Sequence, residues 1–256
     1  MYQLLAFIKY WLLSVNDHSL HSPFVYKFYT EIIKDKANKP EKAVEVLRNQ
    51  LLKDQTVIEI EEMGAGSRMN ASNSRPLSQI AKHAATPLSF SLLLSSIIKH
   101  YQFKQIVELG TSLGLNSAYM ALASPTVKLT TFEGSDSIAT IAKRNFKQLD
   151  LKNIEIVVGN IDQTLEKWLD RNEKIDLAYQ DANHRYEPTV RYFDLLIAHM
   201  DAEGIIILDD IHWSKEMNQA WNELKNHPSV SLSIDLFEGG ILFLNQKLPK
   251  HHYILD

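Results

Sequence analysis

Hydrophobic residues recur with two different periods along this chain. From residue 87 onward, short segments of five or six residues rich in apolar and β-branched side chains alternate with longer segments in which apolar residues recur every three or four positions. The short runs predict strands at 105–109, 128–133, 154–158, 175–180 and 204–208. The longer segments predict helices at 87–100, 115–123, 135–149, 162–170, 187–200 and 215–225. Strands that alternate with helices in this way form a parallel sheet with helices on both faces.

The end of the chain departs from this alternation. Residues 230–237 and 241–245 read as two strands without a helix between them, and Glu238-Gly239-Gly240 predicts a tight hairpin turn. The predicted fold class is therefore α/β: a seven-stranded, mostly parallel, doubly wound sheet that ends in an antiparallel hairpin.

Residues 1–84 predict a helical N-terminal cap, and residues 85–256 the sheet domain. Ser22 and Pro23 indicate the start of a helix that runs to residue 33, with Ser22 as N-cap, and a second helix is expected over 40–52. Residues 64–76 have no apolar period and are expected to form a mobile loop. This loop either carries Arg68 and Arg75 as a lid over a pocket or is a solvated connector.

The first fourteen residues are apolar and aromatic. They are too short to span a bilayer, and Lys9 interrupts them. We expect an amphipathic helix that packs on the body of the protein or on a second subunit, as in a homodimer. Binding to a membrane surface is the alternative, although such helices have a more basic polar face.

Composition narrows the function classes only slightly. The formal net charge of -4 provides no basic field for nucleic acid, so no nucleic-acid partner is expected. The absence of cysteine excludes disulfides, thiol nucleophiles and cysteine-based zinc sites. A cytoplasmic location is the expectation.

The stretch from Ile106 to Met120 combines an apolar strand, a glycine turn and a helix. Gly110 and Gly114 let the backbone approach a ligand closely, and the helix start presents free N–H groups to it. This arrangement predicts a site for a nucleotide-like ligand. The pattern is acid-x-G-x-x-x-G, beginning at Glu108, whereas a dinucleotide fingerprint reads G-x-G-x-x-G.

The acid before the first glycine and the final hairpin resemble class I S-adenosylmethionine-dependent methyltransferases over residues 87–256. The resemblance implies that Glu108 faces the amine of the cofactor's methionine and that Glu133 binds its ribose, whereas Asn160 meets the adenine edge. It implies these cofactor-binding residues: Glu108, Gly110, Thr111, Ser112, Gly114, Asn116, Glu133, Gly134, Asn160, Ile161 and Asp181. The alternatives are an ordinary turn after each strand and, for Asn160, a common Gly-Asn turn pair.

The segments after the fourth and fifth strands resemble those of small-molecule, catechol-type O-methyltransferases. The resemblance implies a small hydroxylated acceptor and a divalent cation, Mg²⁺ or Ca²⁺, bound by Asp181, Asp209 and Asp210. Such ions prefer oxygen ligands. The alternative role of the three aspartates is helix N-capping. The stretches His21–Phe24 and Gly64–Ser67 also resemble those of an uncharacterised bacterial subgroup, which indicates no substrate.

Two histidines and one aspartate are the candidate catalytic residues. His184 occupies the position of the family's catalytic lysine, and His212 follows the aspartate pair. Either imidazole is able to act as a general base near neutral pH, and Asp181 lies three residues before His184. The alternative for both histidines is a surface or helix-cap position.

Three other functions remain open on the sequence alone. An NAD(P)-dependent Rossmann enzyme would also use a glycine turn and a ribose-binding acid, but the glycine spacing and the terminal hairpin disfavour it. A non-catalytic module that keeps the fold is disfavoured by the retained Glu108, Gly110, Glu133 and Asp181. Nucleic-acid methylation is disfavoured by the net charge and by the lack of an Asn/Asp-Pro-Pro-aromatic motif.

Overall fold

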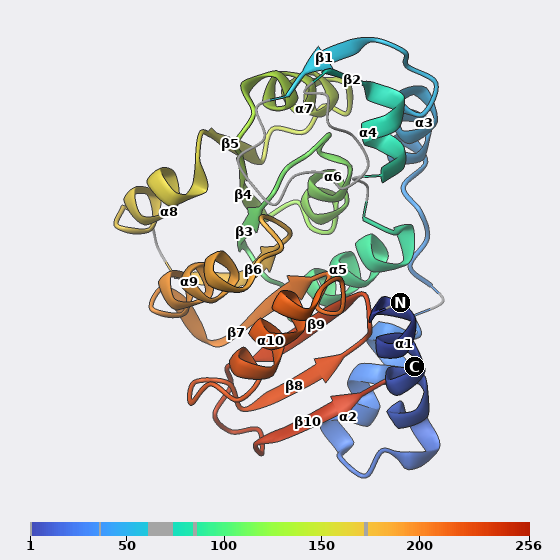
Figure 1. Cartoon of the computed structure of the whole chain (residues 1–256), viewed down its shortest axis with the longest axis vertical. Helices are drawn as coiled ribbons and strands as arrows, with labels where there is room; N and C mark the ends of the chain where they lie inside the picture. The colour runs from blue at the N-terminus through green and yellow to red at the C-terminus, as the bar shows by residue number, and fades with distance from the viewer. Residues whose placement is uncertain (1, 36, 61–73, 84–85, 172–173) are drawn as a thin grey trace. The chain divides into compact units, whose positions relative to one another are not determined.

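The computed structural model describes residues 2–35, 37–60, 74–83, 86–171 and 174–256 (Figure 1). The chain divides into two compact units. Unit 1 joins Met1–Thr30 to Leu169–Asp256, and unit 2 is Glu31–Trp168. Most of the loop expected at 64–76 lies outside the described residues.

Unit 2 is built on three parallel strands with the order β3-β4-β5. The strands are β3 (Gln105–Leu109), β4 (Lys128–Glu133) and β5 (Ile154–Val158), each with the predicted bounds. The helices are α3 (Lys42–Leu51), α4 (Leu77–His83), α5 (Leu88–Tyr101), α6 (Leu115–Leu122), α7 (Asp136–Gln148) and α8 (Ile161–Leu169). Parallel pairing places the carboxyl ends of the three strands at one edge, where the glycine turn follows β3.

A small antiparallel pair, β1 (Val57–Glu59) and β2 (Ser74–Pro76), also belongs to unit 2. The sequence-based expectation of a loop up to residue 76 is wrong at Ser74–Pro76, because these residues pair with Val57–Glu59. Isolated three-residue strands lack the apolar alternation from which strands are recognised, and only the pairing reveals them.

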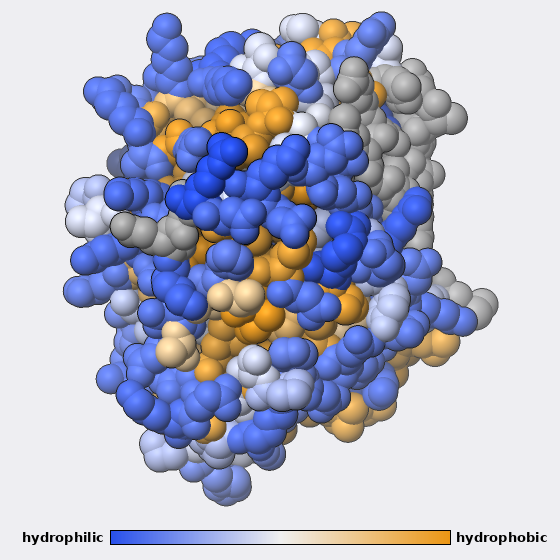
Figure 2. Space-filling model, turned by 90° about the vertical axis from the view of Figure 1, so that its left-hand side faces the viewer, coloured by the Kyte–Doolittle hydropathy of each residue, from blue (hydrophilic) through white to orange (hydrophobic). Residues whose placement is uncertain are grey.

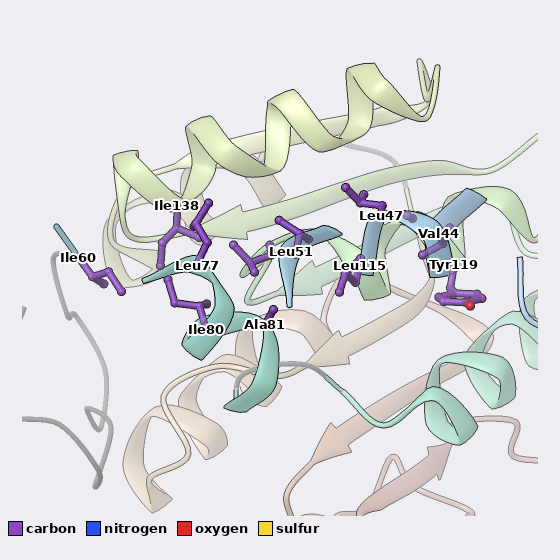
Figure 3. Packing of buried hydrophobic residues seen from close by; sticks show 12 residues of the cluster. Val44, Leu47, Leu51, Ile60, Leu77, Ile80, Ala81, Leu115, Tyr119 and Ile138 are labelled. Atoms are coloured by element: carbon purple, nitrogen blue, oxygen red, sulfur yellow. The ribbon is translucent and has the colours of Figure 1, made fainter. Parts of the chain in front are cut away.

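The core of unit 2 joins the N-terminal helices to the sheet helices (Figure 3). One buried cluster contains Leu47 and Leu51 of α3, Leu77 and Ile80 of α4, and Leu115 of α6. The cluster also contains Val44, Ile60, Ala81, Leu113, Ala118, Tyr119 and Ile138. Helices α3 and α4 therefore pack on the helix that follows the glycine turn, and burial of their apolar faces contributes about 1.5–3 kcal/mol per large side chain.

Unit 1 contains five strands with the order β10-β8-β9-β7-β6. They are β6 (Ile175–Gln180), β7 (Met200–Asp209), β8 (Leu232–Asp235), β9 (Gly239–Phe243) and β10 (His251–Ile254). Strand β9 is antiparallel to β7 and β8, whereas the pairs β6–β7 and β8–β10 are parallel. Consequently Gln180, Asp209, Asp235 and Ile254 end their strands at one edge. The helices are α1 (Tyr2–Leu13), η1 (Asp17–Ser19), α2 (Pro23–Phe28), η2 (Tyr29–Ile33), α9 (Tyr186–Ile197) and α10 (Lys215–Leu224).

Eight strands of the mixed α/β architecture are described over the two units, rather than the seven predicted. The additional strand is β10, which pairs with β8 from His251↔Leu232 to Ile254↔Asp235. Its sequence, His-His-Tyr-Ile, has no apolar alternation because it is an edge strand with half-exposed side chains. The mostly parallel strands and the antiparallel β8–β9 pair are confirmed.

Several bounds in unit 1 differ from the sequence-based prediction, among them those of β7 and β9. Met200 begins β7 instead of ending α9, and it pairs with Ile175. Gly239 and Gly240 belong to β9, so the turn is Leu236–Glu238. Packing explains Gly240: a Cβ there would lie 2.5 Å from the indole of Trp221.

The two ends of the chain meet in unit 1. Val15 forms a parallel bridge with Leu255, and the Tyr10 hydroxyl donates to the Leu255 carbonyl. The Tyr29 hydroxyl donates to Asp256 Oδ1 at 2.7 Å. Ser22 Oγ accepts from Val25 N at 3.4 Å, which confirms the predicted N-cap of α2. These bonds hold the N-terminal helices beside the carboxyl end of β10 (Figure 1).

Candidate functional site

The turn after β3 has a backbone that requires glycine. Gly110, Ser112 and Gly114 have φ angles of 104°, 49° and 77°. At Gly114, which is the N-cap of α6, a Cβ would lie 2.4 Å from the Phe146 ring. Gly110 N and Thr111 N both donate to the Phe132 carbonyl, and Thr111 Oγ1 lies 2.6 Å from Thr131 Oγ1. The turn is thus fixed against β4 with its backbone accessible at the carboxyl edge.

Glu108 is wholly buried below this turn. Its carboxylate accepts hydrogen bonds from Asn116 Nδ2 at 3.2 Å and from Ser117 Oγ. Burial raises the pKa of Glu108 to about 7, although the hydrogen bonds from Ser117, Thr131 and Asn116 oppose the shift. The resemblance implied that this carboxylate faces the cofactor. In unit 2 it binds the first turn of α6 and so positions Asn116.

A pocket opens beside the glycine turn within unit 2. It is lined by Ile80 and Ala81 of α4, by Thr86, and by Ser112, Leu113, Leu115 and Asn116. Asn116 is 7% exposed, and its Oδ1 has no hydrogen-bond partner among the described residues. A buried acceptor without a partner fits a ligand that brings a donor, such as the α-ammonium group of S-adenosylmethionine. Thr86 and α4 were missed at the sequence level, because no motif marks them.

Glu133, at the end of β4, ties the turn to the next loop. Its Oε2 accepts from Ser112 N and its Oε1 from Ser135 N, both at 2.9 Å. Burial raises the pKa of Glu133. Each carboxylate oxygen retains a second lone pair, so Glu133 is able to accept hydrogen bonds from the two hydroxyls of a ribose at the edge.

Asn160 caps the helix that follows β5. Its Oδ1 accepts from Asp162 N at 2.9 Å, and its carbonyl accepts from Gln163 N and Thr164 N. Gly159, with φ 128°, and Ile161, the first residue of α8, flank it. Asn160 therefore has a capping role, whereas the sequence offered only a Gly-Asn turn pair as the alternative to binding adenine.

In unit 1, one histidine and three aspartates gather at the ends of β6 and β7. His184 Nε2 lies 3.5 Å from Asp181 Oδ1, and His184 Nδ1 lies 3.9 Å from Asp210 Oδ2. Burial lowers the pKa of His184, and the nearby charge of Asp210 opposes this shift. Burial raises the pKa of Asp209 to about 7, and the charge of Asp210 adds to it. Asn183, His184 and Asp210 all have positive φ, a strained conformation that is concentrated at functional sites.

The aspartates do not have the arrangement of a cation site. In the part of the chain that the structure describes, no group of three or more His, Asp or Glu side chains could hold a metal ion. Asp209 is hydrogen-bonded with Asp181, and its raised pKa favours a shared proton between the two carboxyl groups.

His212 lies in a separate hydrogen-bonded cluster. Its Nε2 is 2.9 Å from Asp235 Oδ2, and Asn218 Nδ2 is 3.0 Å from its Nδ1. Its ring stacks on Phe237 at 5.2 Å. Asp235 also accepts from Trp221 Nε1 and Phe237 N. Both ring nitrogens of His212 are occupied, whereas those of His184 lie at longer distances from their partners.

Gln180 is a further edge residue that the sequence reading did not single out. It ends β6 and is 5% exposed, and neither polar atom of its amide has a partner among the described residues. Asp235 was also not predicted, although it is an acid at the end of a strand, the same feature that marked Glu133 and Asp209. The structure thus brings the predicted residues together within each unit: the turn, Glu133 and Asn116 in unit 2, and Asp181, His184, Asp209 and Asp210 in unit 1.

The raised pKa of Glu108 predicts a pH-dependent stability. The folded state holds its proton up to a pH of about 7, whereas the unfolded chain releases it near 4.5. The contribution of protonated Glu108 to the free energy of unfolding is therefore complete below pH 4.5. It is lost as the pH rises toward 7, by up to about 1.4 kcal/mol per pH unit. Glu108→Gln, which remains neutral, is expected to flatten this slope in urea unfolding measured at pH 5, 6 and 7. A slope equal to that of the wild type would contradict the assignment.

Comparison with known proteins gives one family and a set of similar folds. Residues 107–211 match the family described as a methyltransferase domain. A search of curated proteins by sequence finds no match. Among solved structures, the chain is similar to an O-methyltransferase from Bacillus cereus in complex with SAH, with 17% identity, a TM-score of 0.60 and coverage of 83% of this chain and 94% of that one.

Two other solved structures show the same likeness. A SAH-bound methyltransferase from Podospora anserina has 13% identity and a TM-score of 0.63, with coverage of 90% of this chain and 97% of that one. The O-methyltransferase TomG from Streptomyces achromogenes, involved in tomaymycin synthesis and in complex with SAM, has 17% identity and a TM-score of 0.60, with 86% and 95% coverage. At these identities the likeness shows a Rossmann-like methyltransferase fold. Of the helices that the structure describes, none combines the length and apolar character that a bilayer crossing needs.

Proposed function

We propose that this chain, whose residues 107–211 carry a methyltransferase domain, transfers a methyl group from S-adenosylmethionine to a hydroxyl of a small molecule. The observation that carries the proposal is the turn of residues 110–114. It leads from β3 into α6, and Glu133 binds its backbone from the next strand end. Structures of this fold bind nucleotides at this edge. We place the enzyme in the cytoplasm, where a chain without cysteine needs no oxidising compartment.

Unit 2 supplies the cofactor-binding residues in this proposal. Asn116 Oδ1 accepts a hydrogen bond from the cofactor's ammonium group, and Glu133 accepts hydrogen bonds from its ribose hydroxyls. The backbone of the turn from Gly110 to Gly114 lies along the cofactor. Asn160 and Ile161 border the adenine. Bound S-adenosylmethionine supplies a methyl group on a positively charged sulfur that leaves as a neutral thioether. The protein's task is to orient the acceptor and to remove its proton.

Unit 1 supplies the general base, His184. Because its pKa is lowered, the imidazole is unprotonated at neutral pH and free to accept a proton. It takes the proton of the acceptor hydroxyl as the oxygen forms its bond to the methyl carbon and the carbon–sulfur bond breaks. Asp181 and Asp210, at 3.5 and 3.9 Å, stabilise the resulting imidazolium. The proton then leaves to solvent. No step requires a metal ion.

His212 is a positioning residue in this scheme. Its two ring nitrogens are bonded to Asp235 and Asn218, and its ring stacks on Phe237. Phe237 in turn contacts Phe7 and Tyr10 of α1 at 5.1 and 5.2 Å between ring centroids. We propose that residues 1–84 form the cap that selects the acceptor, with these aromatic rings as part of its wall.

Calorimetric titration tests the cofactor assignment. SAH is expected to bind the wild type, and NAD⁺ is not. Glu133→Ala removes charge-assisted hydrogen bonds and is expected to weaken SAH binding roughly 10- to 100-fold. The matched control is Glu155→Ala, which removes an exposed acid of β5 and is expected to leave the affinity unchanged.

The acceptor is sought with radiolabelled S-adenosylmethionine and a panel of catechols, phenols and aliphatic alcohols. Label transfer to a hydroxyl supports the proposal. Binding of NAD⁺ without SAH would overturn the cofactor assignment. Tight SAH binding without transfer to any member of a broad panel would favour a non-catalytic module.

A further inference from the structure

Helix α1 exposes a stripe of five large apolar side chains. Leu4, Leu5, Ile8, Trp11 and Leu12 are 62%, 60%, 44%, 67% and 68% exposed. Because successive residues of a helix are about 100° apart, these five side chains lie within about 120° of one another. We call them the α1 stripe. By contrast, the face of the molecule in Figure 2 is mainly hydrophilic, with apolar side chains visible between polar ones.

The α1 stripe is not the side of the helix that packs on its own unit. Phe7 and Tyr10 make that contact through the Phe237 ring, and the Tyr10 hydroxyl donates to the Leu255 carbonyl. No side chain of α1 is buried. A helix that is apolar on more than one side is typical of a buried element, which indicates a partner on the second side.

The α1 stripe is symmetric in sequence about Ile8. Leu4 and Leu12 lie four positions on either side of it, and Leu5 and Trp11 lie three positions on either side. In an antiparallel pair of identical helices with a twofold axis at Ile8, Leu4 lies next to the partner's Trp11 and Leu5 next to the partner's Leu12, because the members of each pair share one side of the interface and differ by one residue in height. Such a contact is isologous, since each residue pair occurs twice about the axis, and it covers all five side chains on both copies.

We propose that two copies of this chain associate through the α1 stripe, with Ile8 on the twofold axis. Covering the stripe on both copies buries on the order of 1,200 Å², the lower end of the range for specific interfaces. A membrane surface is disfavoured because Lys9 is the only charged residue of α1 and the net charge is -4. Helices that bind membrane surfaces have a basic polar face that is attracted to anionic lipid.

The proposal stands independently of the methyltransferase function, but it has a consequence for it. The inner side of α1 contacts Phe237, and Phe237 stacks on His212. A partner helix on the α1 stripe would hold Phe7 and Tyr10 in place at the carboxyl edge of unit 1. Association would thereby order the wall of the proposed acceptor site.

Sedimentation velocity at tens of micromolar tests the association. The wild type is expected at twice the chain mass of 29.3 kDa, and Ile8→Glu at the chain mass itself, because it places two carboxylates at the axis. The matched control, Leu13→Glu, changes a leucine that is 52% exposed on the same helix but about 140° from Ile8, and it is expected to remain a dimer. An equimolar mixture of Ile8→Glu and Ile8→Lys is expected to recover the dimer.

Cysteine cross-linking locates the axis. The chain has no cysteine, so Ile8→Cys provides a single thiol that is expected to form a covalent dimer on oxidation, whereas Leu13→Cys is not. A cooperative melting transition in both Ile8→Glu and Leu13→Glu shows that both variants fold, and the monomeric variant is expected to melt at the lower temperature. A monomeric wild type would overturn the proposal, as would an Ile8→Glu dimer. A wild type that is monomeric and sediments with phosphatidylcholine–phosphatidylglycerol vesicles would assign the α1 stripe to membranes instead.

Discussion

Replacing His184 by asparagine is expected to lower the turnover number of methyl transfer by about 10²- to 10⁴-fold, the usual contribution of a general base. The amide fills similar space but accepts no proton at neutral pH. The affinity for SAH, measured by calorimetry, is expected to stay within twofold of the wild type, because the cofactor-binding residues belong to unit 2. Retention of more than a tenth of the turnover would contradict the assignment of His184 as base.

The pH profile separates a base from a structural histidine. Because burial lowers the pKa of His184, the wild-type rate is expected to be constant around neutral pH and to fall on the acid side as the imidazole is protonated. In His184→Asn this acid limb is expected to disappear. His212→Asn serves as the comparison: it breaks the bond to Asp235 and is expected to lower the melting temperature while the acid limb remains.

Gly114→Ala is expected to have the largest effect on folding and on cofactor binding together. A φ of 77° costs an L-residue about 1–2 kcal/mol, and a Cβ at 2.4 Å from the Phe146 ring adds an overpacking cost of about 1–3 kcal/mol. Urea unfolding is therefore expected to show a loss of about 2–5 kcal/mol. SAH binding, measured at a low temperature at which the variant is fully folded, is expected to weaken as well because the turn must shift.

A double variant divides this cost into its two causes. Phe146→Leu in the Gly114→Ala background removes the ring atoms that lie nearest to the new Cβ, so it is expected to recover the packing part and leave the φ part. The matched control is Phe146→Leu alone. If the double variant is no more stable than Gly114→Ala, the clash with Phe146 is not the cause.

The regular part of the fold follows from the sequence because its elements are set by local pattern. Strands 105–109, 128–133, 154–158 and 175–180 have the predicted bounds. Each contains at least two β-branched or aromatic residues and is followed by a polar or glycine-containing turn, which is the composition typical of strands. Strand β10 and the β1–β2 pair could not be predicted, because their side chains are half-exposed or polar and only the pairing defines them.

The candidate site divides in the same way. Its positions were predictable, because in an open α/β sheet the residues after parallel strands meet at one edge. Their roles were not. In the sequence, Glu108 is equivalent to Glu133 and His212 to His184, because each pair has the same residue type near a strand end. In the structure, however, Glu108 is buried and hydrogen-bonded to Asn116 and Ser117. Both ring nitrogens of His212 are also hydrogen-bonded. Hydrogen-bond partners come from distant parts of the chain, so no local pattern specifies them.

By itself, the sequence determined the alternation of strands and helices, the glycine turn and the set of acids and histidines at strand ends, since these depend on period, spacing and residue type. The tertiary structure decided which of these groups are free to act. It buried Glu108, paired Asp209 with Asp181 and lowered the pKa of His184, because burial and neighbouring charges set the pKa of each group. It also decided that the α1 stripe faces away from Phe237, since the side of a helix that packs depends on what lies beside it.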